Sequence, residues 1–341
     1  MGRKTKKNIL FTDAVWNRVN PENKELIEEF LEYLRSTDHS PSTILQYESD
    51  LRQFFCYDYS MMGNKHITEL TKRDYLKWQN MAINEWEWSP NRLARVRSVI
   101  SSLENYIECF CDDVWPDFRP LIRKIPAPVK QEVRIKTVMT VDEVEAFLQD
   151  MVDRGEIERA VTFALAAYSG RRKSELPRFR MSDFDDDCIV AGALYKTRSK
   201  IKTKGRGKNG KALYCYVLKH PFDKYLNLWR EYRKENGIES EWLLTDPDMP
   251  EEQIKTTTID SWSRVLSRRT GRDIYPHAFR HLLVSFYVQE GIPTTIIKDI
   301  FGWESTALVD IYNDNEVDDQ LDKYFGEDGI KPQSQKNIGD I

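Results

Sequence analysis

The sequence predicts a two-domain protein that is mainly α-helical and contains a small β-sheet. Its 341 residues are a little over two typical domain lengths. Between residues 20 and 110, apolar residues recur at three- and four-residue steps, which is typical of helices that bury one face. Only two short segments, 188–195 and 212–218, have the composition of strands. We therefore expect a helical N-terminal domain followed by a mixed α/β domain.

The N-terminal part of the chain predicts a loose arm and then four helices. Residues 1–19 show no clear period, whereas 20–115 read as a small helical domain. Asn20 is suited to cap the first helix, and Pro21 to its first turn. Three further helices are expected after the breaks and caps at Ser40-Pro41, Thr71 and Ser89-Pro90.

The next segment, 116–138, contains four of the fourteen prolines and predicts an extended linker. The second domain is expected over 139–328 and a tail over 329–341. Thr140 begins its first helix with a capping-box pattern, and the two strand-like segments flank a glycine-spaced basic hairpin tip. Helices are expected at 160–168, 221–236, 257–270, 276–290, 293–302 and near 317–325.

Composition excludes several classes of protein. Hydrophobic residues make up 40% and charged residues 31%, and no apolar run approaches the ~18 residues of a membrane span. We expect no membrane partner and, because the apolar stretch at 9–11 is too short for a secretion signal, a cytoplasmic location. The five cysteines lack zinc-ligand spacing, so no metal site is expected.

The net charge of −4 argues against nucleic-acid binding through bulk positive charge. The charge is nevertheless unevenly distributed, because residues 196–211 contain eight basic side chains and no acidic one. Such a segment is either a solvated loop or a local binding surface for an anion.

Two further features in the second domain bring together residues suited to phosphate chemistry. In GRRKSEL, residues 170–176, Arg172 and Glu175 are three apart at the expected start of a helix, so the carboxylate can orient the guanidinium. In PHAFRH, residues 276–281, His277 can transfer protons near neutral pH and Arg280 offers a planar fork that matches phosphate. The alternatives are a surface ion pair and a structural histidine.

The last feature is Phe301-Gly302-Trp303, with Tyr312 nine residues after the tryptophan. Taken in order with the basic hairpin and the two motifs above, it resembles the tyrosine recombinase (phage integrase) family, in which a nucleophilic tyrosine follows Leu-Gly-His or Leu-Gly-Trp. The resemblance covers about residues 22–325. The matching residues are Gly170, Arg172, Ser174, Glu175, Leu176, His277, Arg280, Gly302, Trp303 and Tyr312. Trp303 stands where most members have histidine, and Phe301 replaces the usual leucine.

The resemblance implies an enzyme that cleaves and rejoins DNA through a 3′-phosphotyrosine, without metal, ATP or another cofactor. Tyr312 would attack the scissile phosphate, and Arg172 and Arg280 would bind its non-bridging oxygens. His277 would assist proton transfer or bind the phosphate, Trp303 would donate a hydrogen bond, and Glu175 would hold Arg172. A hairpin lysine would protonate the 5′ oxygen, and we favour Lys204 over Lys200, Lys202 and Lys208 because it precedes the first turn glycine.

The expected partner is double-stranded DNA with specific recombination sites, bound by a homotetramer on paired sites, as for a mobile element. A need for accessory DNA-bending or directionality proteins stays open, as does nucleoid association in a prokaryotic host. Two alternatives remain: a type IB topoisomerase-like enzyme and an inactive DNA-binding accessory protein. The basic residues expected to contact DNA, unless they are only solvated decoration, are Lys72, Arg73, Arg92, Arg95, Arg97, Lys200, Lys202, Arg206 and Lys208.

Overall fold

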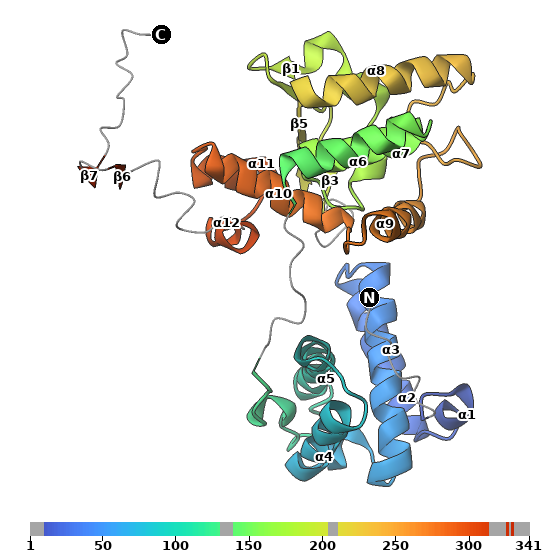
Figure 1. Ribbon diagram of the computed structural model, residues 1–341. Helices are drawn as coiled ribbons and strands as arrows, with labels where there is room; N and C mark the ends of the chain where they lie inside the picture. The colour runs from blue at the N-terminus through green and yellow to red at the C-terminus, as the bar shows by residue number, and fades with distance from the viewer. Residues whose placement is uncertain (1–9, 130–138, 204–210, 314–324, 327–328, 331–341) are drawn as a thin grey trace. The chain divides into compact units, whose positions relative to one another are not determined.

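A computed structural model describes residues 10–129, 139–203, 211–313, 325–326 and 329–330 (Figure 1). The described residues form two compact units, one on each side of the gap at 130–138. Most of their elements are helices and the strands are short, so the predicted mainly α class with a small sheet is confirmed. Within the described ranges, no helix has both the length and the apolar character needed to cross a bilayer.

The first unit is a helical bundle whose helices begin at the predicted caps. The side chains of Asn20, Thr71 and Ser89 each accept a hydrogen bond from a backbone amide in the first turn that follows. Proline occupies the first turn of three of these helices, where its missing amide has no partner to lose. The α-helices are α1 (Asp13–Trp16), α2 (Pro21–Ser36), α3 (Pro41–Tyr57), α4 (Lys72–Asn84) and α5 (Pro90–Phe110).

The first unit is larger than the sequence indicated at both ends. Phe11 and Trp16 of the expected loose arm pack on its core. In the expected linker, Phe118, Ile122 and Ile125 are buried, and a 3-10 turn forms at Ile122–Lys124. The expectation of an arm to residue 19 and a linker from 116 is therefore wrong at these positions. The proline content suggested an extended segment. The large apolar side chains between the prolines, however, are more stable buried in the core than exposed to water.

The second unit is built around α7 (Ile157–Ser169), which is buried over most of its length. It contacts α6 (Val141–Asp153), α8 (Lys219–Glu235) and α10 (Pro276–Gln289). The remaining helices are α9 (Thr256–Thr270), α11 (Thr294–Phe301) and α12 (Ala307–Tyr312). Around α7 they form the mainly helical body seen in the upper part of Figure 1.

A small antiparallel sheet and a hairpin complete this unit. The sheet has the order β1-β2-β5, from Ile189–Val190, Leu194–Lys196 and Tyr216–Leu218. Between β2 and β5 the chain forms a second pair, β3 (Ile201–Lys202) and β4 (Ala212–Leu213), in which Ile201 faces Leu213. The expected basic hairpin is thus present, while its tip at 204–210 lies outside the described residues.

Two local expectations in this unit are wrong, and one helix was not expected. The GRRKSEL segment does not begin an α-helix: it is a turn followed by a 3-10 turn at Leu176–Arg178, because Pro177 has no amide for a continuing helix. The helix α12, which carries Tyr312, was not expected. Phe325–Gly326 is a strand, β6, paired with β7 (Gly329–Ile330), so the expected helix does not extend to 325. The rest of that segment, 317–324, lies outside the described residues.

Candidate active site

The turn after α7 brings the first arginine to the site. Gly170 ends α7 with a φ of 57°, and a Cβ there would lie 2.8 Å from the Phe301 ring, so this position needs glycine. Arg172 follows, and its Nη1 donates to Glu175 Oε1 at 3.1 Å. The other carboxylate oxygen of Glu175 accepts from the Arg172 backbone amide at 3.1 Å. Glu175 is buried, so it orients Arg172 as the spacing predicted.

Arg280 lies at the centre of the site and is completely buried. Its Nη1 donates to the carbonyl of Gly170 at 3.1 Å, but Nε and Nη2 have no hydrogen-bond partner among the described residues. The guanidinium lies 5.0 Å from the Trp303 ring centroid and 5.5 Å from that of Tyr312. Burial, together with the charge of Arg172, lowers the pKa of Arg280 to about 9. This cation would be stabilised by an anion.

Tyr312, the last residue of α12, packs among aromatic side chains. Its ring stacks on Trp303 with centroids 4.8 Å apart and an angle of 23°. The ring of His281 lies 4.7 Å away and that of His277 lies 5.2 Å away, the latter in an edge-on arrangement. The Tyr312 carbonyl accepts a hydrogen bond from Ser285 Oγ at 3.3 Å, which links the end of α12 to α10.

His277 is the second residue of α10. The residue as a whole is exposed to solvent, yet its ring lies against Tyr312. Partial desolvation of the imidazole and the positive charges of Arg280 and Arg172, together with the neighbouring His281, lower the pKa of His277 to about 4. The imidazole is therefore neutral near pH 7. A neutral ring beside a tyrosine can accept a proton or a hydrogen bond.

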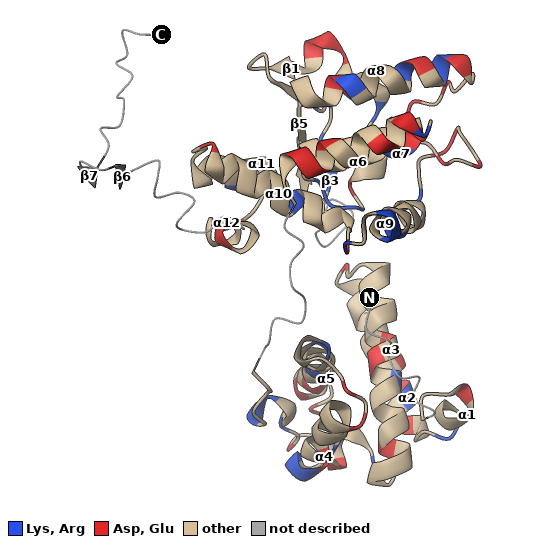
Figure 2. Ribbon diagram, in the orientation of Figure 1, with Lys and Arg blue, Asp and Glu red and all other residues tan. Residues whose placement is uncertain are grey.

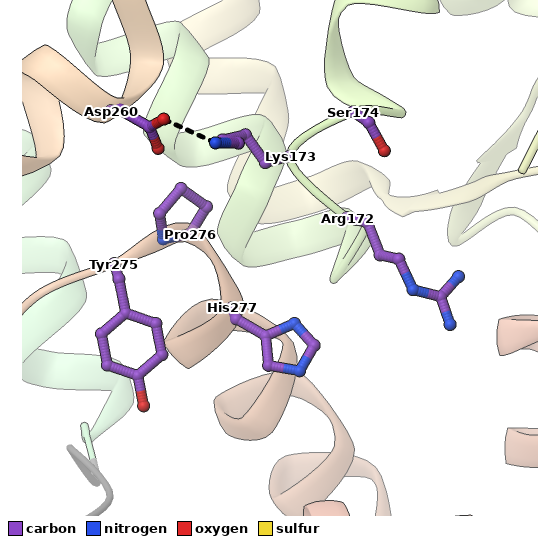
Figure 3. Close-up of a pocket in the computed structure, with 7 residues that line it drawn as sticks. All are labelled: Arg172, Lys173, Ser174, Asp260, Tyr275, Pro276 and His277. Carbon is purple, nitrogen blue, oxygen red and sulfur yellow. Dashed lines mark hydrogen bonds and ion pairs between the residues drawn. The ribbon is translucent and has the colours of Figure 1, made fainter. Parts of the chain in front are cut away.

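A cavity of about 300 Å³ opens between Arg172 and His277 (Figure 3). Its far wall carries an ion pair in which Lys173 Nζ lies 2.5 Å from Asp260 Oδ2 of α9. The second half of α9 contains three arginines, so basic residues lie along this helix (Figure 2). The lining residues are Arg172, Lys173, Ser174, Asp260, Tyr275, Pro276 and His277.

The hairpin lysines are only partly described. Lys204, Arg206 and Lys208 lie outside the described residues, whereas Lys202 is exposed at the end of β3, where its carbonyl accepts from Arg178 Nη1 at 2.6 Å. Lys200 lies 5.7 Å from the ring of Tyr214. The structure therefore brings together Arg172, Glu175, His277, Arg280, Trp303 and Tyr312, without describing Lys204.

In the first unit, one expected DNA contact is wrong. Arg97 is buried and donates to Gln79 Oε1 at 2.5 Å and to the carbonyls of Ile122 and Ile125 at 2.9 and 2.5 Å. It holds the segment after α5 against the bundle and cannot reach a phosphate. Sequence spacing did not reveal this role because the partners are backbone carbonyls about 25 residues away.

The other basic residues expected to contact DNA in this unit differ in their surroundings. Arg95 forms a bidentate ion pair with buried Asp50, at 3.1 and 3.0 Å. Arg92 lies over the Trp88 ring and donates to Gln53 Oε1 at 2.8 Å. Lys72 and Arg73 are exposed at the start of α4.

Two residues beside the site were not singled out from the sequence. His281 follows Arg280 and packs on Tyr312 at 4.7 Å. Arg171 precedes Arg172 and is buried, with a relative exposure of 1%. In the sequence, the signal that could have identified them is their position next to Arg280 and Arg172. Among the described residues, no group of three or more His, Cys, Asp or Glu side chains is placed to hold a metal ion.

The fold and the site define a class of protein: a helical unit is joined to a unit in which one arginine, two histidines and a tryptophan pack around a tyrosine, and a second arginine lines the adjoining cavity. Residues 137–318 match the phage integrase family, and residues 27–107 match the N-terminal SAM-like domain of phage integrases. The chain belongs to the phage integrase family, the tyrosine recombinases. The predicted family and its DNA strand-transferring class of activity are thus confirmed, and the two alternatives are not favoured.

Relatives and solved structures agree with this assignment. The SPbeta prophage-derived recombinase-like protein YomM of Bacillus subtilis is 29% identical over 283 residues, which cover 82% of each chain. The tyrosine recombinase XerA of Thermococcus kodakarensis is 24% identical, over 85% of this chain and 91% of its own. The Tn1549 transposon integrase in complex with circular intermediate DNA has the same fold, with a TM-score of 0.66 and 14% identity over 87% of this chain and 98% of its own.

Proposed function

We propose that this protein is a site-specific recombinase that cleaves and rejoins duplex DNA through a 3′-phosphotyrosine at Tyr312. The observation that carries the proposal is the buried guanidinium of Arg280, whose Nε and Nη2 lack partners in the described part of the chain, next to the ring of Tyr312. A buried cation with free donors requires an anion, and a phosphodiester fits its planar fork.

The proposed chemistry assigns each group a role. The Tyr312 oxygen forms a bond to phosphorus while the bond from phosphorus to the 5′ oxygen breaks. Arg172 and Arg280 stabilise the negative charge on the non-bridging oxygens, with Glu175 holding Arg172 in place. Neutral His277 accepts the tyrosine proton or a phosphate hydrogen bond, and the indole of Trp303 donates a further hydrogen bond.

The leaving oxygen needs a proton, which we assign to a hairpin lysine, with Lys204 preferred. The new phosphotyrosine ester conserves the energy of the broken bond, so the reverse attack by a 5′ hydroxyl rejoins DNA without ATP. No metal or cofactor takes part in this scheme.

The proposed substrate is double-stranded DNA with specific recombination sites, in the cytoplasm and, in a prokaryotic host, at the nucleoid. Solved relatives support the DNA partner, since XerH is described bound to its palindromic difH substrate in a post-cleavage complex. We propose a homotetramer on paired sites, with or without accessory DNA-bending or directionality proteins. Phosphate contacts are assigned to Lys72, Arg73, Arg92, Arg95, Lys200, Lys202, Arg206 and Lys208.

The test is formation of a covalent adduct on a nicked duplex that traps the intermediate. The wild-type protein should give a protease-sensitive, slowly migrating species, and Tyr312→Phe should give none. Tyr232→Phe, a remote tyrosine of α8, is the matched control and should react normally. An adduct with Tyr312→Phe would contradict the assignment. Strand exchange between paired sites, rather than relaxation of one supercoiled circle, separates a recombinase from a topoisomerase.

A further inference from the structure

Arg171, between the glycine and the first arginine of the GRRKSEL turn, is a buried cation that the chemistry above does not use. Its relative exposure is 1%, and its Nη2 donates to the carbonyl of Ile300 at 2.6 Å. Nε and Nη1 have no hydrogen-bond partner among the described residues. Burying a charged group with free donors costs free energy unless other interactions of that group offset the cost.

The carbonyl that Arg171 binds is in the last turn of α11. Two other carbonyls of this turn accept from the residues that follow, Asp299 from the Gly302 amide at 3.1 Å and Lys298 from the Trp303 amide at 2.9 Å. A guanidinium at the C-terminus of a helix satisfies a terminal carbonyl and interacts favourably with the helix dipole. Arg171 therefore adds a third hydrogen bond to the C-terminal turn of α11, shortly before Trp303.

The same guanidinium lies over the first of three stacked rings. Arg171 is 5.6 Å from the Phe301 ring centroid, Phe301 stacks on Trp303 at 5.0 Å, and Trp303 stacks on Tyr312 at 4.8 Å. The angles between successive planes are 21° and 23°. Packed rings transmit a shift of one member to the next, because they have little free space between them.

We propose that Arg171 is a positioning residue for strand cleavage, which acts by holding the end of α11 and the stack Phe301-Trp303-Tyr312 in register with Arg172. The inference rests on the proposed function. In this proposal Arg171 acts on the phosphate site only through its neighbours. It joins the turn that carries Arg172 to the end of α11, just before Trp303, so that both sides of the site keep one spacing.

The test compares Arg171→Met with Arg233→Met. Arg233 of α8 is also a buried guanidinium, which donates to the carbonyls of Trp242 and Ser240 and lies 5.8 Å from the Trp229 ring. Each variant loses at least one buried hydrogen bond and a ring contact, but only Arg171 borders the site. We expect Arg171→Met to slow single-turnover adduct formation at saturating protein by about 10-fold or more, as a small misplacement of reacting groups does. DNA affinity should change less than about 3-fold, and Arg233→Met should cleave at the wild-type rate.

A double variant identifies the path of the effect. If Arg171 acts through the ring stack, Arg171→Met should cost less than about 3-fold in a Trp303→Leu background, because coupled residues are not additive. An equal cost in both backgrounds, or wild-type cleavage by folded Arg171→Met, would overturn the proposal.

If Arg171→Met does not fold, Arg171→Lys is the variant that tests the proposal. This variant keeps the charge and can still donate to the Ile300 carbonyl, but it loses the planar contact with Phe301. We therefore expect cleavage about 3- to 10-fold slower and faster hydrogen exchange at the Gly302 and Trp303 amides. Wild-type rate and exchange would refute the role. Failure of the proposed function is distinguishable, since the wild-type protein would then form no Tyr312-dependent adduct at all.

Discussion

Leu213 of the basic hairpin lies directly against Gly302, at the point where α11 ends and Trp303 follows. A Cβ on Gly302 would stand 1.9 Å from Leu213 Cδ1, and Gly302 has a φ of 65°. Leu213 belongs to β4, which pairs with β3, the strand that carries Lys202. The hairpin therefore contacts Gly302, which directly precedes Trp303, and the Trp303 ring stacks on Tyr312. This contact links the lysine-bearing hairpin to Tyr312, the proposed nucleophile.

Gly302→Ala should lower both stability and cleavage. Gly271→Ala is a matched control, because Gly271 ends α9 with a φ of 68° but a Cβ there would meet no atom within 4 Å. We expect the control to lose about 1 kcal/mol from backbone strain and Gly302→Ala to lose roughly 2–3 kcal/mol, since Leu213 must also move. Urea unfolding and adduct formation measure the two effects. Equal losses for the two variants would show that the Leu213 contact is unimportant.

The two site arginines should act on the transition state more than on binding. Arg172→Ala or Arg280→Ala should slow cleavage by on the order of 100-fold, as expected for loss of a charge-stabilising donor, with a much smaller change in DNA affinity. Arg154→Ala, at the exposed residue that follows the last turn of α6, is the control and should leave both unchanged. Single-turnover cleavage and equilibrium binding give the comparison. Parallel losses in binding and cleavage would identify them as ordinary phosphate anchors.

The general acid among the hairpin lysines can be found with a 5′-bridging phosphorothioate. The thiolate leaving group needs little protonation, so the variant that lacks the general acid should regain activity on this substrate. We expect Lys204→Ala to be rescued, and Lys202→Ala and Lys208→Ala to show the same ratio of rates on the two substrates as the wild-type protein. Rescue of Lys202→Ala instead would assign the role to the described strand β3.

Asp58 should make the first unit less stable as the pH rises. Its side chain is buried, and burial raises the pKa of this carboxyl to about 7, with the Lys65 amide and ammonium offsetting only part of the shift. The unfolded chain has the ordinary pKa of about 4, so folding favours the protonated form. The stability due to this group is fully present below about pH 4 and is lost as the pH rises through 7.

Asp58→Asn removes that titration. We expect the variant to be more stable than the wild-type protein at pH 8, by on the order of 2–4 kcal/mol, and to show no such gain at pH 4. Asp117→Asn, an exposed carboxyl in the same unit, should give no pH-dependent difference. Urea unfolding from pH 4 to 8 measures this, and a constant difference between Asp58→Asn and wild type would be inconsistent with a buried titrating carboxyl.

Much of the fold was predictable because its signals are local. Caps such as Asn20 and Thr71, with their characteristic neighbours, specify where helices begin, and both accept the expected amide hydrogen bonds. The spacing of Arg172 and Glu175 predicted a contact that the turn forms without the expected helix. The family resemblance rests on the order and spacing of the motifs along the chain, so it does not depend on the three-dimensional structure.

Burial of charged residues was not predictable in the same way. Arg97 and Arg171 look like surface arginines in the sequence, yet both are buried against carbonyls that belong to other segments. Phe118 and Ile122 lie among prolines that suggest a linker, yet they join the core of the first unit. Such outcomes depend on which segments meet in space.

The fold class, the family and six of the candidate site residues that the structure brings together were predictable from the chain alone, because they follow from periodicity, capping and motif order. The burial of Arg280 with free donors beside Tyr312, and the hydrogen bond from Arg171 to the last turn of α11, became visible in the three-dimensional structure alone. The physical reason is that burial and hydrogen-bond satisfaction are set by the packing of distant segments, whereas periodicity and caps are set by neighbours along the chain.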